Sequence, residues 1–208
     1  MTGRLVAVAL GLALGLASCA EGAGDAADDA GGRTPSVVAD ATSGASPAAP
    51  SAASPGPCPD LEPAEPVDGG LPDLELPCLG DGPDVNLADL RGVPTVVNVW
   101  AAWCTNCDRE MPLFAAAQTK AGDRVRFFGV HYKADRDYGL RSEADFGVPF
   151  PSVHDEDGDR VALKLRATAP PQTFFVTAGG RVAGREIGEI TSAEQLAELV
   201  ERHLGVVL

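Results

Sequence analysis

The sequence predicts an α/β fold, in which a mixed β-sheet is flanked by helices and preceded by a short β extension. Two observations support this prediction. Apolar, β-branched runs of strand length recur between residues 71 and 187, and segments whose apolar residues have helical spacing lie between them. The last two runs are joined by a glycine-rich turn, so part of the sheet is antiparallel. The expected order after the extension is β-α-β-α-α-β-β-α.

The β extension is predicted from two short stretches. Residues 71–76 alternate between apolar and polar side chains and have prolines near their margins, which is typical of an edge strand. Residues 84–92 predict a short strand followed by a turn. The apolar stretch 96–100 then predicts a buried strand. A helix follows it, with apolar residues at three-residue intervals, and ends near Gly122.

The other elements lie in the second half of the chain. Three further strands are predicted at residues 125–130, 172–176 and 182–187. Two short helices are predicted at residues 137–146 and 159–166. The last helix is expected to begin at Thr191, because Thr191-x-x-Glu194 has the spacing of a capping box.

Length and charge limit what the protein can be. The chain has 208 residues, enough for one domain of ordinary size with appendages. Its formal net charge is −14, which argues against a nucleic-acid partner, because phosphates would be repelled.

The start of the chain has the features of a bacterial lipoprotein signal. Arg4 gives a short basic segment, and residues 5–16 form an apolar stretch too short to span a bilayer comfortably. The ending Leu16-Ala17-Ser18-Cys19 resembles a lipobox, which is cleaved before the cysteine that carries the lipid. We therefore expect a signal peptide over residues 1–18 and a lipid anchor on Cys19. The alternative is a simple secretory signal with a chance cysteine.

The segment after the signal has almost no large apolar side chains. Residues 20–57 consist mainly of Ala, Gly, Ser, Pro, Thr and Asp, so they cannot bury enough surface to offset the entropy of ordering. We expect residues 19–57 to be a flexible tether and residues 58–208 to form the folded domain.

The chemistry is predicted from Cys104-x-x-Cys107, which lies where a strand ends and a helix begins. The first helical turn has unpaired N–H groups and the positive end of the helix dipole, and both stabilise a thiolate. The three-residue spacing puts the second sulfur within bonding reach of the first, so the dithiol can close and reopen. A structural disulfide and half of a zinc site are the alternatives.

A metal site is not expected. Zinc takes four ligands, and no second cysteine pair has ligand spacing. His131, His154 and His203 are scattered along the chain. His131 ends a predicted strand and is expected to be a surface residue rather than a ligand.

Three motifs occur in an order shared with a known family. They are Leu87-x-x-Leu90-Arg91-Gly92, Asn98-Val99-Trp100-Ala101-Ala102-Trp103-Cys104-x-x-Cys107-x-x-Glu110-x-Pro112, and Pro171-Gln172-Thr173-Phe174. With the predicted element order, they resemble the thioredoxin fold, and more closely the TlpA/ResA/CcmG (DsbE-like) branch of membrane-tethered thiol–disulfide oxidoreductases. The resemblance covers about residues 71–204.

The position of the cysteines and the resemblance together suggest a role for each residue of the site. Cys104 is nearest the helix start and is expected to be the attacking thiol, and Cys107 is expected to resolve the mixed disulfide. Trp103 is expected to cover the sulfur, the alternative being a core residue. Pro171 occupies the family's cis-proline position. Glu110 shares the helix face of Cys107 and is either a proton acceptor that tunes the thiols or an ordinary acid favoured by the helix dipole.

The chain departs from the family pattern inside the cysteine motif. Thr105-Asn106 replaces the commoner x-Pro, so the family's redox behaviour cannot be carried over. Asn98 occupies the position of the buried acid of thioredoxin. Asn cannot accept a proton, so that role, if filled, would fall to Glu110.

Cys58 and Cys78 are expected to form a structural disulfide. They are 20 residues apart, lie next to prolines, and belong to a chain with an export signal, and oxidising export compartments favour such bridges. A second redox pair and two free thiols are the alternatives.

The resemblance implies an extracytoplasmic, membrane-anchored enzyme that needs no cofactor beyond its redox-active disulfide. Relatives of this kind reduce cysteines of apocytochrome c before haem attachment and are fed by a membrane thiol transporter, so these are the implied partners. Other relatives oxidise exported proteins. A copper-binding module that uses Cys104 and Cys107 as soft ligands is a remote alternative, because copper-handling relatives carry Cys-x3-Cys and a partner histidine.

Overall fold

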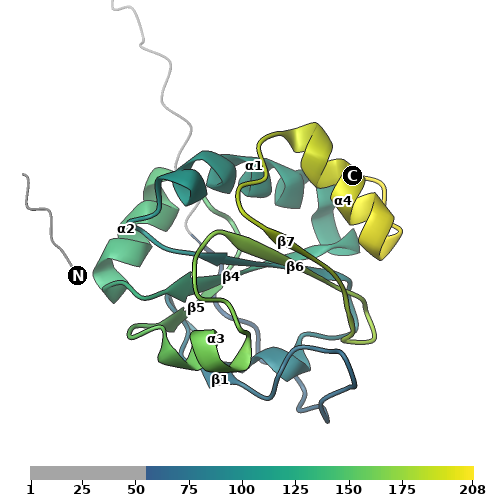
Figure 1. Ribbon diagram of the computed structural model, residues 1–208, viewed down its shortest axis with the longest axis horizontal. Helices are drawn as coiled ribbons and strands as arrows, with labels where there is room; N and C mark the ends of the chain where they lie inside the picture. The colour runs from purple at the N-terminus through teal and green to yellow at the C-terminus, as the bar shows by residue number, and fades with distance from the viewer. Residues whose placement is uncertain (1–54) are drawn as a thin grey trace, which may run out of the picture. The chain divides into compact units, whose positions relative to one another are not determined.

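The computed structural model describes residues 55–208 (Figure 1). The predicted signal peptide, Cys19 and most of the predicted tether lie outside the described residues. The strands are β1 (Glu75–Leu76), β2 (Val85–Asn86), β3 (Thr95–Trp100), β4 (Arg126–Tyr132), β5 (Ser152–Asp155), β6 (Gln172–Val176) and β7 (Val182–Ile187). The α-helices are α1 (Thr105–Ala121), α2 (Arg136–Asp145), α3 (Asp159–Lys164) and α4 (Ala193–Leu204), and short 3₁₀ turns cover Leu87–Asp89 and Gly122–Arg124.

The main sheet has the strand order β5-β4-β3-β6-β7. β3 and β4 pair in parallel, as do β4 and β5, whereas β6 is antiparallel to both β3 and β7. β1 and β2 form a separate antiparallel pair that precedes the main sheet in the sequence. The predicted mixed sheet, thioredoxin-like fold and β extension are confirmed.

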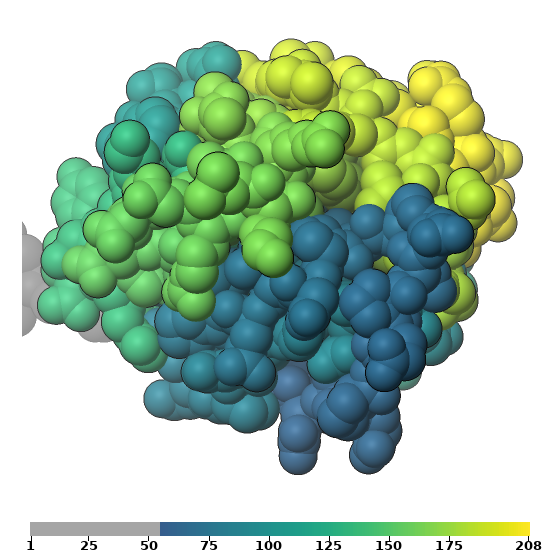
Figure 2. Space-filling model, turned by 60° about the horizontal axis from the view of Figure 1, so that its bottom comes forward, coloured from purple at the N-terminus to yellow at the C-terminus, as the bar shows by residue number. Residues whose placement is uncertain are grey.

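The sheet separates two apolar layers. Successive strand residues point to opposite faces, so Val96 and Val97 enter different layers. One face packs against α1 and α4, and the other is covered by α3 and by the segment that precedes β3 (Figure 1). Figure 2 shows this second face, where the blue segment before β3 lies beside the green region of α3. Because both faces are covered, all six residues of β3 are buried.

The segment that precedes β3 also reaches both edges of the sheet. Gly70 forms a bridge with Arg181 at the start of β7, and the Val182 N–H donates to the Gly69 carbonyl at 2.9 Å. At the other edge, Cys78 forms a bridge with Val153 of β5. We call residues 69–79 the strap.

Two sequence predictions about elements are wrong. β5 was not expected, because its sequence Ser152-Val153-His154-Asp155 is mostly polar and prolines precede it. Each of its residues is nevertheless buried, since the strap and α2 supply partners for the polar groups. The last helix is capped one residue later than predicted, because Ser192 accepts the Gln195 N–H while Gln195 accepts the Thr191 N–H.

Within residues 55–208, no helix combines the length and the apolar character needed to cross a bilayer.

Candidate active site

The topology brings several loops to one end of the sheet. β3 runs directly into the cysteine motif, and β6 is antiparallel to β3, so β6 begins where β3 ends, with Val99 opposite Gln172. Ile187, the last residue of β7, also lies opposite Gln172. The cysteine motif, Pro171 and the loop at residues 188–190 therefore meet at this end.

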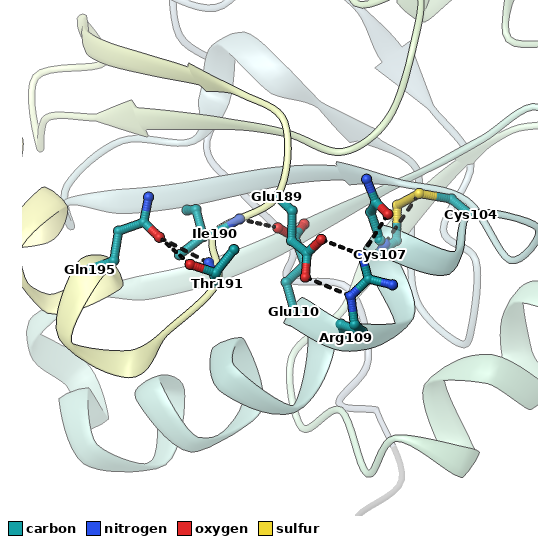
Figure 3. A network of polar contacts seen from close by, with 9 residues as sticks. Cys104, Cys107, Arg109, Glu110, Glu189, Ile190, Thr191 and Gln195 are labelled. Atoms are coloured by element: carbon teal, nitrogen blue, oxygen red, sulfur yellow. Dashed lines mark hydrogen bonds and ion pairs between the residues drawn. A yellow bond between two sulfur atoms is a disulfide. The ribbon is translucent and has the colours of Figure 1, made fainter.

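The two cysteines form a disulfide at the start of α1 (Figure 3). Cys104 is the N-cap of the helix, and its Sγ accepts the backbone N–H of Cys107 at 3.2 Å. The side chain of Cys104 is 7% exposed, whereas Cys107 is completely buried. The helix N-terminus therefore faces the sulfur that an incoming molecule can reach, which favours a thiolate on Cys104 after reduction.

Trp103 is not a core residue. Its side chain is 55% exposed, and its Nε1 donates to the Lys133 carbonyl at 2.7 Å. This contact ties the loop in front of Cys104 to the loop that follows β4. Whether the indole covers the sulfur stays a prediction.

Glu110 is a buried carboxyl group one turn after Cys107. The Asn98 Nδ2 donates to its Oε1 at 2.8 Å, and the Ile190 N–H donates to its Oε2 at 3.0 Å. Burial raises the pKa of Glu110 to about 7, although the two hydrogen bonds oppose the rise. A carboxyl group with this pKa can take up or release a proton near neutral pH, which an ordinary exposed acid on a helix does not do.

A second set of contacts joins α1 to the loop before α4 (Figure 3). The Arg109 guanidinium donates to both carboxylate oxygens of Glu189, at 2.8 and 2.5 Å, and also to the Asn106 Oδ1 at 2.7 Å. Sequence reasoning missed this pair, because 80 residues separate its members and no local pattern joins them.

Pro171 lies beside this loop. The peptide bond between Pro170 and Pro171 is cis, and the Pro171 carbonyl accepts the Gly188 N–H at 3.0 Å. The loop after β7 is therefore bonded to the segment that begins β6 as well as to α1.

The histidine prediction is wrong. His131 is buried rather than exposed, and its Nδ1 lies 3.0 Å from the Nδ1 of His154. The two are opposite each other on β4 and β5, so a strand that the sequence does not predict brings these distant histidines together. Burial, with His154 as a second cause, lowers the pKa of His131 to about 3. His203 lies elsewhere, against Phe175.

A polar cluster continues from this pair beneath α2. The Trp100 Nε1 donates to the Ser152 Oγ at 3.3 Å, and the Ser152 hydroxyl donates to the buried Glu143. Burial raises the pKa of Glu143 to about 7. Among the described residues, no group of three or more His, Cys, Asp or Glu side chains is placed to hold a metal ion.

Cys58 and Cys78 are joined by a disulfide with a Cα–Cα distance of 5.9 Å. Both side chains are buried, and the Cys58 N–H donates to the Asp81 carbonyl at 2.8 Å. The bridge lies at the β5 edge, where the Leu79 N–H donates to the Ser152 carbonyl at 2.8 Å. It links the beginning of the described chain to this edge.

Comparisons with known proteins agree on one group. The AhpC/TSA family model matches residues 67–185. The thiol:disulfide interchange protein DsbE of Pseudomonas fluorescens biotype C is 33% identical over 138 residues, which cover 66% of this chain and 75% of that protein. The thiol:disulfide interchange protein HelX of Rhodobacter capsulatus is 31% identical over 121 residues, which cover 58% of this chain and 67% of that protein.

A solved structure agrees as well. The structure of dsbF from Mycobacterium tuberculosis (MTB), in mixed oxidized and reduced forms, is similar with a TM-score of 0.56 and 27% identity. The similar region covers 62% of this chain and 94% of the dsbF chain.

Proposed function

The chain belongs to the AhpC/TSA family, and from this premise we propose that it is an extracytoplasmic enzyme that reduces disulfides of exported proteins through Cys104 and Cys107. Its chemistry is thiol–disulfide exchange. One observation supports these residues as the reacting pair: they lie at the start of α1, where Cys104 is the N-cap and is more exposed than Cys107.

The exchange takes two steps. In the reduced protein the Cys104 thiolate attacks one sulfur of the substrate disulfide, forming a mixed disulfide and releasing the other substrate sulfur as a thiolate. The Cys107 thiolate then attacks the Cys104 sulfur and releases the second substrate thiolate, which leaves the protein disulfide seen in the structure. Two electrons pass from the protein to the substrate, and a dithiol donor must restore the protein thiols.

Glu110 is proposed as the proton acceptor for Cys107. The resolving thiol must lose its proton before it can attack, and it is completely buried, so water cannot serve it directly. Glu110 lies three residues further along the same helix, and its pKa of about 7 suits a group that accepts a proton at neutral pH and returns it later.

The substrates and location are proposed from the sequence and the relatives. HelX and DsbE are named as thiol:disulfide interchange proteins, which supports substrates that contain cysteine pairs. We place apocytochrome c among these substrates and a membrane thiol transporter as the electron donor. The lipobox-like ending at Cys19 supports a lipid anchor on the extracytoplasmic face of the membrane.

The test is to trap the mixed disulfide. In the Cys107→Ser variant, a peptide with one disulfide should remain bound covalently to Cys104, because the resolving sulfur is gone. The matched Cys104→Ser variant should trap little peptide, because Cys107 is buried. Mass spectrometry of the adducts identifies the sulfur, and trapping through Cys107 alone would contradict the assignment.

The direction of electron flow is tested separately. A reduction potential near that of thioredoxin, measured by equilibration with glutathione, supports the reductase, whereas one near that of strong oxidants would favour an oxidase of exported thiols. A copper titration of the reduced protein tests the binding-module hypothesis, and stoichiometric tight binding would favour it.

A further inference from the structure

The loop that follows β7 holds three parts of the site at once. Gly188 donates its N–H to Pro171, Glu189 pairs with Arg109, and the Ile190 N–H donates to Glu110. Three successive residues therefore contact groups around the cysteine pair, and Figure 3 shows two of them, Glu189 and Ile190, beside Arg109 and Glu110.

Arg109 links this loop to the cysteine motif itself. Its Nη2 donates both to Glu189 and to Asn106, which lies between the two cysteines. The two-point contact with Glu189 fixes the orientation of the guanidinium, because both partners are planar. The Arg109 side chain is 55% exposed, so the pair contributes little to overall stability, and any effect it has must be local.

The pair also sets the charge beside Glu110. Glu189 precedes the residue whose N–H binds Glu110, and its negative charge disfavours a second negative charge on the buried carboxyl. Arg109 precedes Glu110 on α1 and neutralises Glu189. The groups that act on Glu110 are Asn98 on β3 and the Ile190 N–H in the loop, which donate to it, and Glu189, whose charge raises its pKa. Thr173 on β6 contacts Asn98, and Asp108 and Arg109 precede Glu110 on α1.

We propose that the Arg109–Glu189 ion pair controls the charge beside Glu110: Arg109 cancels the negative charge that Glu189 places next to the buried carboxyl group. The inference rests on the proposed role of Glu110 in thiol chemistry. Neither residue of the pair reacts, and both act through Glu110.

The two members of the pair carry opposite charges, and this makes the proposal testable. Arg109→Gln leaves the Glu189 charge without compensation, so the pKa of Glu110 should rise. Glu189→Gln removes that charge and leaves Arg109 without its partner, so the pKa of Glu110 should fall. We expect each change to be about half a pH unit, the size of the effect that one partly screened surface charge has on a neighbouring titrating group.

The measurement is a ¹³C NMR titration of the Glu110 carboxyl carbon in the full chain, with the disulfide closed and the signal assigned by its loss in Glu110→Gln. Opposite shifts in the two variants, and a return toward the wild-type pKa in the double variant, support the proposal. If the pair served only to hold the loop in place, both single variants would free the loop. Glu110 would then lose the hydrogen bond from the Ile190 N–H, and its pKa would rise in both variants. Upward shifts in both variants, or no shift in either, would overturn it.

A matched control comes from α3. Arg160→Gln breaks the ion pair with Asp155, whose closest atoms are 3.5 Å apart, and should leave the Glu110 titration unchanged. An equal shift in this control would also overturn the proposal.

A second readout separates the pair from the proposed function. The ultraviolet titration of the reduced thiols reports whether they follow Glu110. If the Glu110 pKa moves as expected and the thiol titration stays fixed, the charge role of the ion pair stands and the proposed role of Glu110 fails.

Discussion

At the scale of single residues, Glu143 is a carboxyl group held inside the protein away from the cysteines. It accepts a hydrogen bond from Ser152, and its second carboxyl oxygen has no partner among the described residues. Burial raises its pKa to about 7, so the folded protein favours the protonated form. Such a group makes the free energy of unfolding depend on pH.

The sign of this effect follows from proton linkage. Between about pH 4.5 and pH 7 the unfolded chain has already released the Glu143 proton while the folded protein still holds it. The free energy of unfolding therefore falls as the pH rises through this range, by about 3 kcal/mol in total. Glu110, with a pKa also near 7, contributes in the same direction. Burial lowers the pKa of His131, so below pH 6.5 this residue makes the free energy of unfolding rise with pH. Its contribution therefore opposes those of Glu143 and Glu110.

The Glu143→Gln variant isolates this contribution. Gln keeps an oxygen for the Ser152 hydroxyl and cannot ionise, so the variant should gain stability relative to the wild type as the pH rises from 5 to 8. Urea denaturation at several pH values measures the difference, and Glu110 and His131 cancel in it because they are present in both proteins. Parallel curves for the two proteins would show that Glu143 is not protonated in the folded state.

The sequence predicted the roles of site residues that lie in a local motif, but not the contacts between residues that are far apart in the chain. The helix-start position of Cys104 was readable from the strand and helix on either side of it. The partners of Glu110 were not, because Asn98 and Ile190 meet it only after the sheet and the last loop have formed. The pairing of His131 with His154 depended in the same way on a strand whose polar sequence concealed it.

At the scale of elements, β5 shows how a polar strand is buried. Its backbone is paired with β4 on one side and with the strap on the other, where the His154 N–H donates to the Pro77 carbonyl at 2.8 Å. Local propensity disfavours a strand here, but these backbone bonds and the side-chain partners under α2 override it. The disulfide of Cys58 and Cys78 holds the strap in this position.

Removing the disulfide should destabilise the protein without altering the exchange. In the Cys58→Ala/Cys78→Ala variant the unfolded chain regains the freedom of a loop closed by residues 20 apart, which is worth about 3 kcal/mol in the chain-entropy model. Guanidinium denaturation, with Cys104→Ser/Cys107→Ser present in both proteins to remove the other disulfide, measures the loss.

The peptide-trapping yield, measured in the Cys107→Ser background, is the companion readout for the same pair. It should be unchanged when Cys58 and Cys78 are replaced. A large fall in trapping with unchanged stability would mean that this bridge belongs to the redox chemistry instead.

At the scale of the whole molecule, attachment to the membrane is predicted to depend on Cys19. The apolar stretch before it is short, and the described part of the chain has no helix able to span a bilayer. In cells that express Cys19→Ala, the protein should move from the membrane fraction to the soluble fraction. Ser18→Ala, which keeps a small residue next to the cysteine, is the matched control. An undiminished membrane pool in Cys19→Ala would contradict the lipid anchor.

The strap has a consequence for any shortened form of the protein. A fragment that begins at β3 would keep the main sheet and both reactive cysteines, but it would lose the backbone partners at β5 and at the start of β7. Open strand edges recruit strands of other molecules, and the uncovered apolar face beside them would strengthen that association. We therefore expect the strap to protect both edges of this sheet against association, so the smallest soluble fragment must include the strap and begin before Gly69, well before the cysteine motif.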